Sequence, residues 1–366
     1  MKAKRNYSVD LLKCISMLMV IVLHINQYGL KNVEYNAFGA IGITSALGQS
    51  FCVVGVNIFV LISGYFLSGK DAKISKENLI GQYKRLIPLW IQVEMYSIGI
   101  YLVLCTISQS GVEFGYKQLI KQALPLMTNQ YWFFTVYVLL ILVSPFINQL
   151  LCGLERIEYR NMLIVLIAVF SLMPTMNIFG DISGTEYGYS LVWFIVLYCI
   201  GGYIRHFAIK SRRYGIWYFA FVILLFACRL LMIFGPRASY GILNLFSNTY
   251  TSVFVLGASI SLFLAFLKSR KQYKKTGKPI ALVSSLSFAV YLIHEHNLFR
   301  DILWERLICL ERFTDHEGEC IIVMMICIIT IYLFSVIVEY IRVKMLDLAM
   351  IVKEKIRLSR IRNKSL

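Results

Sequence analysis

Apolar segments of about 20 residues recur along most of the chain, and short polar stretches rich in lysine and arginine separate them. Twenty helical residues rise about 30 Å, which matches the hydrocarbon core of a bilayer. The pattern therefore predicts an all-α membrane bundle of about ten transmembrane helices. Their expected ranges are 9–29, 47–68, 86–107, 131–150, 162–179, 190–206, 215–235, 249–267, 280–299 and 320–341.

Composition supports a membrane environment. Hydrophobic residues make up 58% of the 366 residues and charged residues only 16%, with a mean hydropathy of +0.67. A soluble protein needs more polar surface than this. The sequence thus predicts a multi-pass protein of a cell membrane.

The net charge of +17 follows the predicted topology. Of the 37 Lys and Arg residues, 28 fall in the tail and in loops on the side of the N-terminus, and seven fall on the other side. Cytoplasmic loops carry such an excess, so both termini are expected in the cytoplasm. The basicity is then explained by orientation and lipid headgroups, and nucleic-acid binding is not expected. Residues 1–341 form the predicted membrane domain, and 342–366 form a basic amphipathic tail on the inner leaflet.

The nine cysteines show neither a CxxC motif nor Cys/His spacing for a metal. We therefore expect no metal site and no permanently bound cofactor. Cys309 and Cys320 flank one external loop, where they either pair in an oxidising compartment or remain free thiols.

The first helix carries three ionisable residues, Asp10, Lys13 and His24, in an otherwise apolar stretch. At 100° per residue, Lys13 and His24 face within about 20° of each other, and Asp10 lies about 40° to the other side of His24. Lys13 and His24 are about 16 Å apart along the axis, so His24 is expected deep in the membrane. Such residues mark a polar cavity, where His24 can exchange protons. Alternatively, His24 bonds to a neighbouring helix and Lys13 reaches the headgroups.

The second and third helices add further candidates. Asn57 is a buried amide that needs partners, and Ser63 belongs to a small-residue stretch that permits close helix packing. In the third helix, Lys84 and Arg85 lie at the cytoplasmic mouth and Glu94 about two turns further in. These three residues either hold an anionic ligand, or the two cations anchor headgroups.

The remaining candidates come from the fourth and ninth helices. Trp132 begins the fourth helix at the outer face, where an aromatic belt alone would explain it. Ser287, Tyr291 and His294 share one face of the ninth helix. His294 is either a second wall of a polar cavity or an interfacial residue.

Together these segments resemble the membrane-bound acyltransferase family 3, whose members have about ten transmembrane helices. The first helix of this family carries a basic residue, ten further residues and a His, as Lys13 and His24 do. The stretch from Gly55 to Gly64 is similar to the second-helix signature of the family. Trp132 matches the Trp of the fourth helix, and the Tyr291-Leu292-Ile293-His294 segment matches the YL-x-H motif.

One position departs from this resemblance. Many polysaccharide O-acetyltransferases of the family carry Arg-x-x-Arg before a Pro in the third helix, whereas this chain has Gln82 and Arg85. Lys84 is positioned to supply the missing charge. The departure leaves the subgroup, the donor and the acceptor open.

The resemblance implies a membrane O-acyltransferase that uses acetyl-CoA, or another acyl-CoA, as co-substrate and acts on a surface glycan or a lipid-linked precursor. The expected catalytic residues are His24, Lys13 and Asp10, with His24 as general base or acyl carrier. Donor binding is expected at Lys84, Arg85 and Glu94. Residues expected on the acceptor side are Asn57, Ser63, Trp132, Tyr291 and His294. The alternatives are a transporter or flippase for a lipid-linked sugar, and a sensor module without chemistry.

Overall fold

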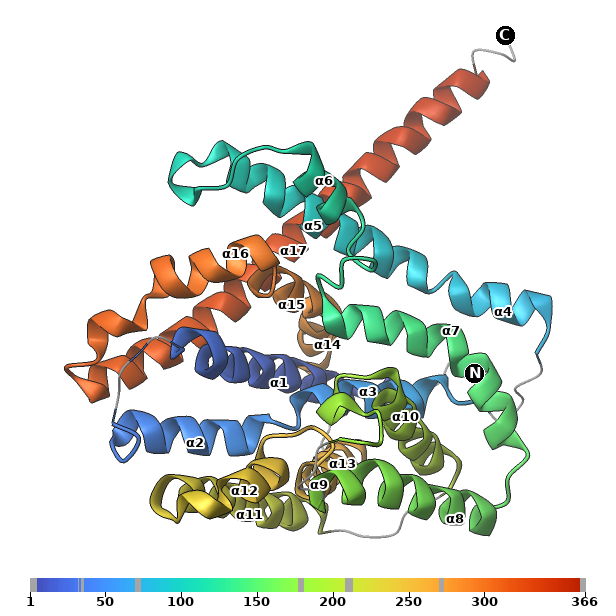
Figure 1. Cartoon of the computed structure of the whole chain (residues 1–366). Coiled ribbons are helices and arrows are strands. Elements are labelled where there is room, and N and C mark those ends of the chain that lie inside the picture. Colours follow the sequence, from blue (N-terminus) through green and yellow to red (C-terminus); the bar gives the residue numbers. More distant parts are fainter. Residues whose placement is uncertain are drawn as a thin grey trace.

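We describe the protein from a computed structural model of the whole chain (Figure 1). The structure describes residues 5–31, 33, 36–69, 74–176, 181–207, 213–269 and 273–362; the side chains of Gln82 and of 352–362 are outside this description. These residues form helices and connecting turns, with no strand among them. The predicted all-α class is therefore confirmed.

Eight helical stretches of the described chain are long and apolar enough to cross a membrane. A helix satisfies its own backbone hydrogen bonds, so segments of this kind fold as helices in lipid. Some stretches consist of two or three short helices in direct succession. Their helices are α1 (Tyr7–His24), α2 (Ala40–Cys52), α3 (Gly55–Leu67), α4 (Lys76–Tyr83), α5 (Leu86–Thr106), α7 (Trp132–Cys152), α8 (Arg156–Ile167), α9 (Met173–Met176), α11 (Tyr214–Phe234), α14 (Gly277–Leu286), α15 (Phe288–His294) and α17 (Glu317–Arg362).

Two shorter apolar helices, α10 (Leu191–His206) and α13 (Val253–Leu267), occupy the sixth and eighth predicted spans. Three short helices lie in the connections: α6 (Tyr116–Ala123), α12 (Tyr240–Ser247) and α16 (Asn297–Asp301). The multi-pass helical architecture agrees with the sequence. The count of ten spans and the orientation of the termini stay predictions.

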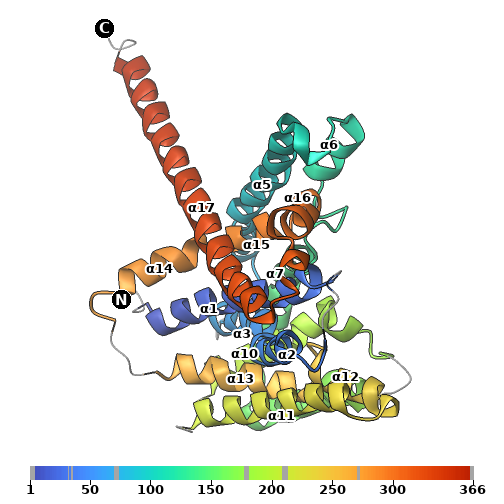
Figure 2. The same ribbon diagram turned by 90° about the vertical axis from the view of Figure 1, so that its left-hand side faces the viewer.

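The helices α1 and α3 lie in the middle of the bundle. Helices α11, α12 and α13 lie on one side of them, and α5 and α6 on the other, as Figures 1 and 2 show from two directions. Helix α3 packs closely against α10, and α1 packs against α3 and α14. This arrangement places α1 between the two halves of the bundle, where its polar residues meet side chains from distant segments.

Local sequence explains how α1 begins and ends. The Asn6 side chain accepts hydrogen bonds from the backbone amides of Ser8 and Val9, and so caps the first turn. After His24 the helix widens into a π-turn, Ile25–Gly29. Single π-turns in helices often accompany functional positions, because they re-aim the neighbouring side chains.

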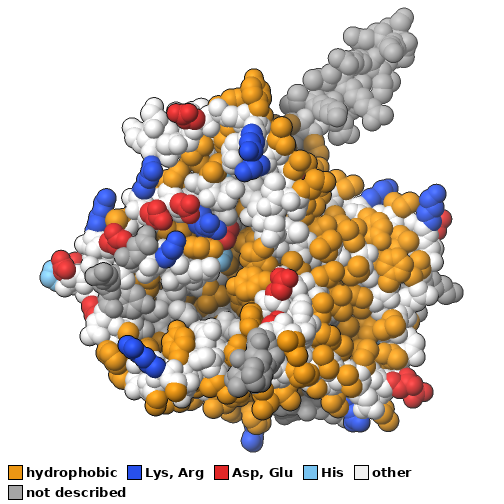
Figure 3. Space-filling model, in the orientation of Figure 1, with side chains coloured by type: hydrophobic (Ala, Val, Ile, Leu, Met, Phe, Trp, Pro, Cys, Tyr) orange, Lys and Arg blue, Asp and Glu red, His pale blue; other side chains and the backbone are white. Residues whose placement is uncertain are grey.

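The surface agrees with a lipid environment. Large hydrophobic side chains are exposed along α5, α8, α11 and α17, where a soluble protein would carry polar groups. In Figure 3 hydrophobic side chains cover a broad area of the visible face, while many acidic and basic ones lie toward its left-hand end and others at its right-hand edge. These faces are therefore suited to contact acyl chains.

Several boundaries differ from the sequence prediction, among them the following three. Helix α2 begins at Ala40 rather than at 47, because its first residues are also apolar and continue the helix outward. The span predicted as 280–299 bends at Ser287 and ends at His294. Helix α17 runs unbroken from the membrane span to Arg362, so the predicted tail at 342 does not begin as a separate element; Figure 2 shows it projecting from the bundle.

Candidate active site

A cavity of about 360 Å³ lies between α1, α3, α7 and the α14–α15 pair. Most of its wall is apolar, with a few hydroxyl groups, Lys13 and His24. A deep apolar cavity with few polar groups is the usual form of a ligand site. Its lining residues are Lys13, Met17, Val20, His24, Val56, Phe59, Ile62, Ser63, Phe66, Leu67, Leu89, Trp132, Phe133, Tyr137, Tyr250, Ser284, Ser287, Phe288 and Tyr291.

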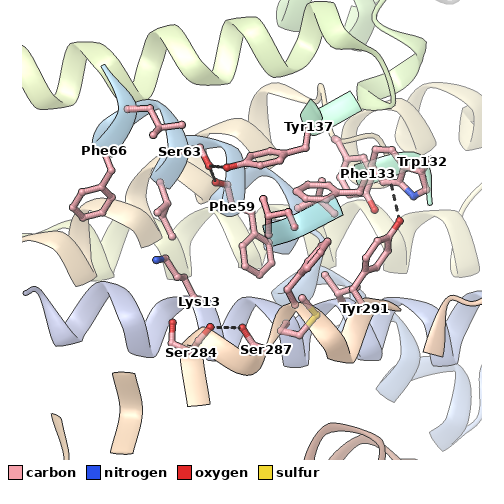
Figure 4. A pocket seen from close by; sticks show the side chains of 18 of the residues that line it. Lys13, Phe59, Ser63, Phe66, Trp132, Phe133, Tyr137, Ser284, Ser287 and Tyr291 are labelled. Carbon is pink, nitrogen blue, oxygen red and sulfur yellow. Dashed lines mark hydrogen bonds between the residues drawn. The ribbon is translucent and has the colours of Figure 1, made fainter. Parts of the chain in front are cut away.

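Lys13 and His24 both line this cavity from α1, as their helical spacing suggests. Figure 4 shows Lys13 and Phe66 toward one end of the cavity and Trp132 and Tyr291 toward the other. With about 16 Å between them along the axis, Lys13 and His24 mark different depths of one channel.

His24 forms a buried hydrogen bond with His294. Its Nδ1 lies 2.8 Å from Nε2 of His294, while Nδ1 of His294 contacts the carbonyl oxygen of Val290. A carbonyl only accepts, so Nδ1 of His294 carries the proton and its Nε2 is the acceptor. Nδ1 of His24 must then be the donor, which leaves Nε2 of a neutral His24 with a free lone pair. The partners therefore fix the tautomer that a general base needs.

Glu295 adds a carboxylate to this pair. Its Oε1 lies 3.3 Å from Nδ1 of His24 and has no hydrogen-bond partner, and its Oε2 lies 3.9 Å from the Arg300 guanidinium. The side chain of Glu295 is only 7% exposed. A carboxylate so close to Nδ1 stabilises the imidazolium that forms when His24 takes up a proton at Nε2.

His24, His294 and Glu295 lie close enough to hold a metal ion, although the sequence gave no ligand spacing for one. Two imidazole nitrogens on one tetrahedral ion at about 2.05 Å would lie roughly 3.3 Å apart. The observed 2.8 Å between the rings is a hydrogen-bond length instead. The geometry therefore favours a shared proton, and the expectation of no metal site stays a prediction.

Asp10 lies outside the cavity wall and holds two cations. Its carboxylate accepts a 2.6 Å bond from Nε of Arg5 and lies 3.9 Å from Nζ of Lys13. The hydrogen bond with Asp10 raises the pKa of Arg5, which therefore stays charged. Arg5 also donates to the carbonyl oxygen of Ala281 and so joins α1 to α14. Asp10 thus sets the position of Lys13 rather than facing a ligand.

Hydroxyl groups occur at intervals along the cavity. Ser63 donates to the Phe59 carbonyl and lies 3.3 Å from the Tyr137 hydroxyl. Near the other end, the Tyr291 hydroxyl accepts from the Phe133 amide at 3.3 Å, as drawn in Figure 4. These groups offer hydrogen bonds to a ligand with separated amides.

Asn57 does not line the cavity. It is fully buried, donates to the Tyr250 carbonyl and to Ser259, and accepts from the indole of Trp193. A buried amide needs hydrogen-bond partners, and the protein itself supplies them here. No donor or acceptor of Asn57 therefore points to a substrate. Asn57 therefore ties α3 to α10 and α13.

Lys84, Arg85 and Glu94 are also absent from the cavity wall. Helix α5 lines it only with Leu89. The side chains of Lys84 and Arg85, just before this helix, are exposed, and Glu94 is half-buried. The cation pair and the carboxylate are therefore not part of this cavity, and their role in donor binding stays a prediction. The Gln82 side chain is outside the described part of the chain.

Several residues in or beside the cavity carried no sequence signal strong enough to select them. Glu295 follows His294 directly, but only the packing of α15 against α1 shows that it reaches His24. Tyr137 and Tyr250 are two of 23 tyrosines, and their position at the cavity depends on helix packing. Arg300 lies beside Glu295 and Tyr28, which no spacing along the chain indicates.

Comparison with known families identifies the chemistry of this arrangement. A family model described as an acyltransferase domain matches residues 6–340. The match spans the cavity and all the helices that line it. No curated protein and no solved structure gives a significant match to the chain.

Proposed function

Because the chain belongs to the acyltransferase-3 family, a family of acyltransferases, we propose that it transfers an acetyl group from cytoplasmic acetyl-CoA to a hydroxyl of a cell-surface or lipid-linked polysaccharide. From the family match we take the chain to be an enzyme rather than a carrier. Its long apolar helices indicate a multi-pass membrane protein. The acetyl donor and the glycan acceptor are our proposal.

The observation that supports this proposal most is the free Nε2 of His24 on the cavity wall. His294 accepts the Nδ1 proton of His24, and Glu295 lies ready to balance a positive ring. A neutral, oriented imidazole of this kind acts as a general base toward a hydroxyl group.

The proposed step conserves atoms and charge. Nε2 of His24 takes the proton of the acceptor hydroxyl while the oxygen attacks the thioester carbonyl carbon. The carbon–sulfur bond then breaks, the acetyl group stays on the acceptor oxygen, and the imidazolium returns its proton to the departing CoA thiolate. His24 ends as it began, ready for a second turnover.

The shape of the cavity suits the donor. The pantetheine arm of CoA is long and thin and carries two amides, which match the separated hydroxyls of Ser63, Tyr137 and Tyr291 along an apolar channel. Lys13 lies toward the opposite end from Trp132. We therefore place the entry of the donor arm at Lys13 and the acceptor at the Trp132 end.

Entry of the donor arm at Lys13 requires that the N-terminal side of the membrane is the cytoplasm. We propose that the chain has ten membrane spans, with both termini in the cytoplasm of a bacterial cell. The support is the excess of Lys and Arg on that side. Fusions of alkaline phosphatase and of green fluorescent protein to Leu366 test it. Fluorescence without phosphatase activity is expected, and the opposite pattern would reverse the assignment.

The enzymatic test uses the full-length protein in detergent with acetyl-CoA and a glycan fraction from the cell envelope. Release of CoA and an added acetyl mass on the glycan are expected, and both should be lost in His24→Ala. CoA release that is the same in both proteins would remove His24 from the mechanism, and absence of any release would reject the proposed donor.

A further inference from the structure

Three aromatic rings cluster at the Trp132 end of the cavity. The ring centroid of Trp132 lies 4.6 Å from that of Tyr189 and 6.4 Å from that of Tyr250, and the two tyrosine rings lie 5.3 Å apart. Trp132 and Tyr250 line the cavity, whereas Tyr189 does not and is 42% exposed. Tyr189 therefore extends the aromatic wall from the cavity to the molecular surface.

The loop that carries Tyr189 is held by Asp181. One carboxylate oxygen accepts from the Ser183 amide at 3.1 Å, and the other accepts from the Thr185 hydroxyl and from the Tyr187 amide at 2.9 Å. Partial burial opposes ionisation, but these hydrogen bonds together lower the pKa of Asp181. The carboxylate thus fastens residues 181–187 into one turn.

Backbone conformation shows how tightly this turn is constrained. Glu186 and Tyr187 both have positive φ angles, 49° and 54°, which residues with a side chain rarely adopt. Such conformations persist only where the surrounding contacts hold them, and they concentrate at ligand clamps. The Asp181 hydrogen bonds are contacts of this kind.

The loop is also fixed to the cavity wall through Tyr250. The Tyr250 amide donates to the Tyr187 carbonyl at 3.0 Å. Gly188 has a φ of 110°, and a Cβ there would lie 2.4 Å from Cβ of Tyr250. The loop and the cavity wall therefore form a single surface, in which the backbone that carries Tyr189 is packed against Tyr250.

We propose that Tyr189 contacts the sugar ring of the acceptor and helps to determine acceptor specificity, and that Asp181 is a positioning residue that acts through this loop. The inference rests on the proposed function. The C–H face of a pyranose packs on an aromatic ring, and tyrosine offers an apolar face with a polar edge. Trp132 and Tyr250 lie against part of the Tyr189 ring, and its exposed part is left for the acceptor.

The test measures initial rates of CoA release from acetyl-CoA by the full-length protein. The acceptor probes are the methyl glycosides of glucose, galactose and N-acetylglucosamine, and each KM is determined separately for glycoside and donor. The variants are Tyr189→Ala, Tyr189→Phe and Asp181→Asn. Asn keeps the size of Asp but has only one acceptor oxygen, so the turn loses part of its hydrogen bonding.

An aromatic contact of about 0.5–1.5 kcal/mol corresponds to roughly a twofold to twelvefold rise in the glycoside KM for Tyr189→Ala. Tyr189→Phe should stay near the wild type, and Asp181→Asn should raise the same KM. The donor KM should not move. Tyr116→Ala, at a tyrosine that is 78% exposed outside this cluster, and Asp315→Asn, at an exposed acid, serve as matched controls.

Other outcomes overturn the inference. It is wrong if no glycoside accelerates CoA release by the wild type, or if Tyr189→Ala and Asp181→Asn lower kcat while both KM values stay fixed. Equal rises in the donor and glycoside KM values would indicate a merely structural role. Failure of the wild type to consume any acetyl-CoA would instead reject the proposed function, so the two failures are distinguishable.

Discussion

Nδ1 of His24 lies 2.8 Å from Nε2 of His294, although 270 residues separate them in the chain. The Val290 carbonyl determines which of these nitrogens carries the proton. Because the proton on His24 must then lie on Nδ1, its other nitrogen is free to accept one from a substrate. This relationship converts a buried histidine into a candidate base.

Replacing His24 by Ala should therefore lower kcat by about a hundredfold to ten-thousandfold, the usual contribution of a general base. Initial rates of CoA release measure the effect. The donor KM should change little, because the imidazole acts in the transition state. Elution of the variant as a monodisperse peak is the folding control, and near wild-type kcat would contradict the role of His24.

His294 should act through His24 rather than on the substrate. His294→Leu removes the acceptor for the Nδ1 proton, and the loss of this buried hydrogen bond should lower kcat by roughly tenfold to a hundredfold. His294→Gln offers an oxygen at a similar distance and should recover part of the rate. If Leu and Gln lower kcat equally, the hydrogen bond is not what orients His24.

Part of this site was predictable from the sequence, because the periodicity of a helix is local. Lys13 and His24 lie eleven residues apart on α1, and this spacing alone places both on one face. The contact with Glu295 depends on how α15 packs against α1, which no spacing within either segment reveals.

Other predicted site residues do not line the cavity, and the reason is again that helix packing is not a local property. Asn57 is an amide that could bind a ligand, but Trp193 from α10 and the Tyr250 carbonyl from the turn before α13 use its hydrogen bonds. Lys84, Arg85 and Glu94 lie close together in the sequence, yet none of them lines the cavity. The fold class was easier to predict, since a long apolar segment in lipid has few alternatives to a helix.

Lys13 and the exposed pair Lys84 and Arg85 should contribute to donor binding in different ways. Lys13 lines the cavity and would contact the pantetheine arm, whereas the pair lies outside, where only the nucleotide phosphates would reach it. Lys13→Gln should raise the KM for acetyl-CoA and for S-acetylpantetheine, each by about tenfold. The double variant Lys84→Gln/Arg85→Gln should raise only the KM for acetyl-CoA, because S-acetylpantetheine lacks the nucleotide.

Kinetics with both donors therefore locate the two contacts. If the double variant affects both donors equally, the exposed pair acts on the arm or on the fold rather than on phosphates. If Lys13→Gln changes neither KM, the donor does not pass Lys13, and the proposed entry is wrong.

The close contact between α3 and α10 sets the position of one cavity wall. A Cβ added at Gly64 would lie 2.3 Å from the carbonyl oxygen of Tyr198, and backbone atoms cannot move aside as a flexible side chain can. Gly64→Ala must therefore separate the two helices, at a cost of about 1–3 kcal/mol. Gly99, in the middle of α5, has no atom within 4 Å of such a Cβ, so Gly99→Ala is the matched control and should be neutral or slightly stabilising.

Thermal unfolding of the detergent-solubilised proteins, followed by size-exclusion chromatography of a fluorescent fusion, measures this difference. Gly64→Ala should melt several degrees lower than the wild type, and Gly99→Ala should not. Because Ser63 and Phe59 line the cavity from the same helix, Gly64→Ala should also lower the rate of CoA release at a temperature where it remains folded. A Gly64→Ala protein as stable as Gly99→Ala would show that α3 and α10 do not approach as closely as this packing requires, and the position assigned to the α3 wall would then be wrong.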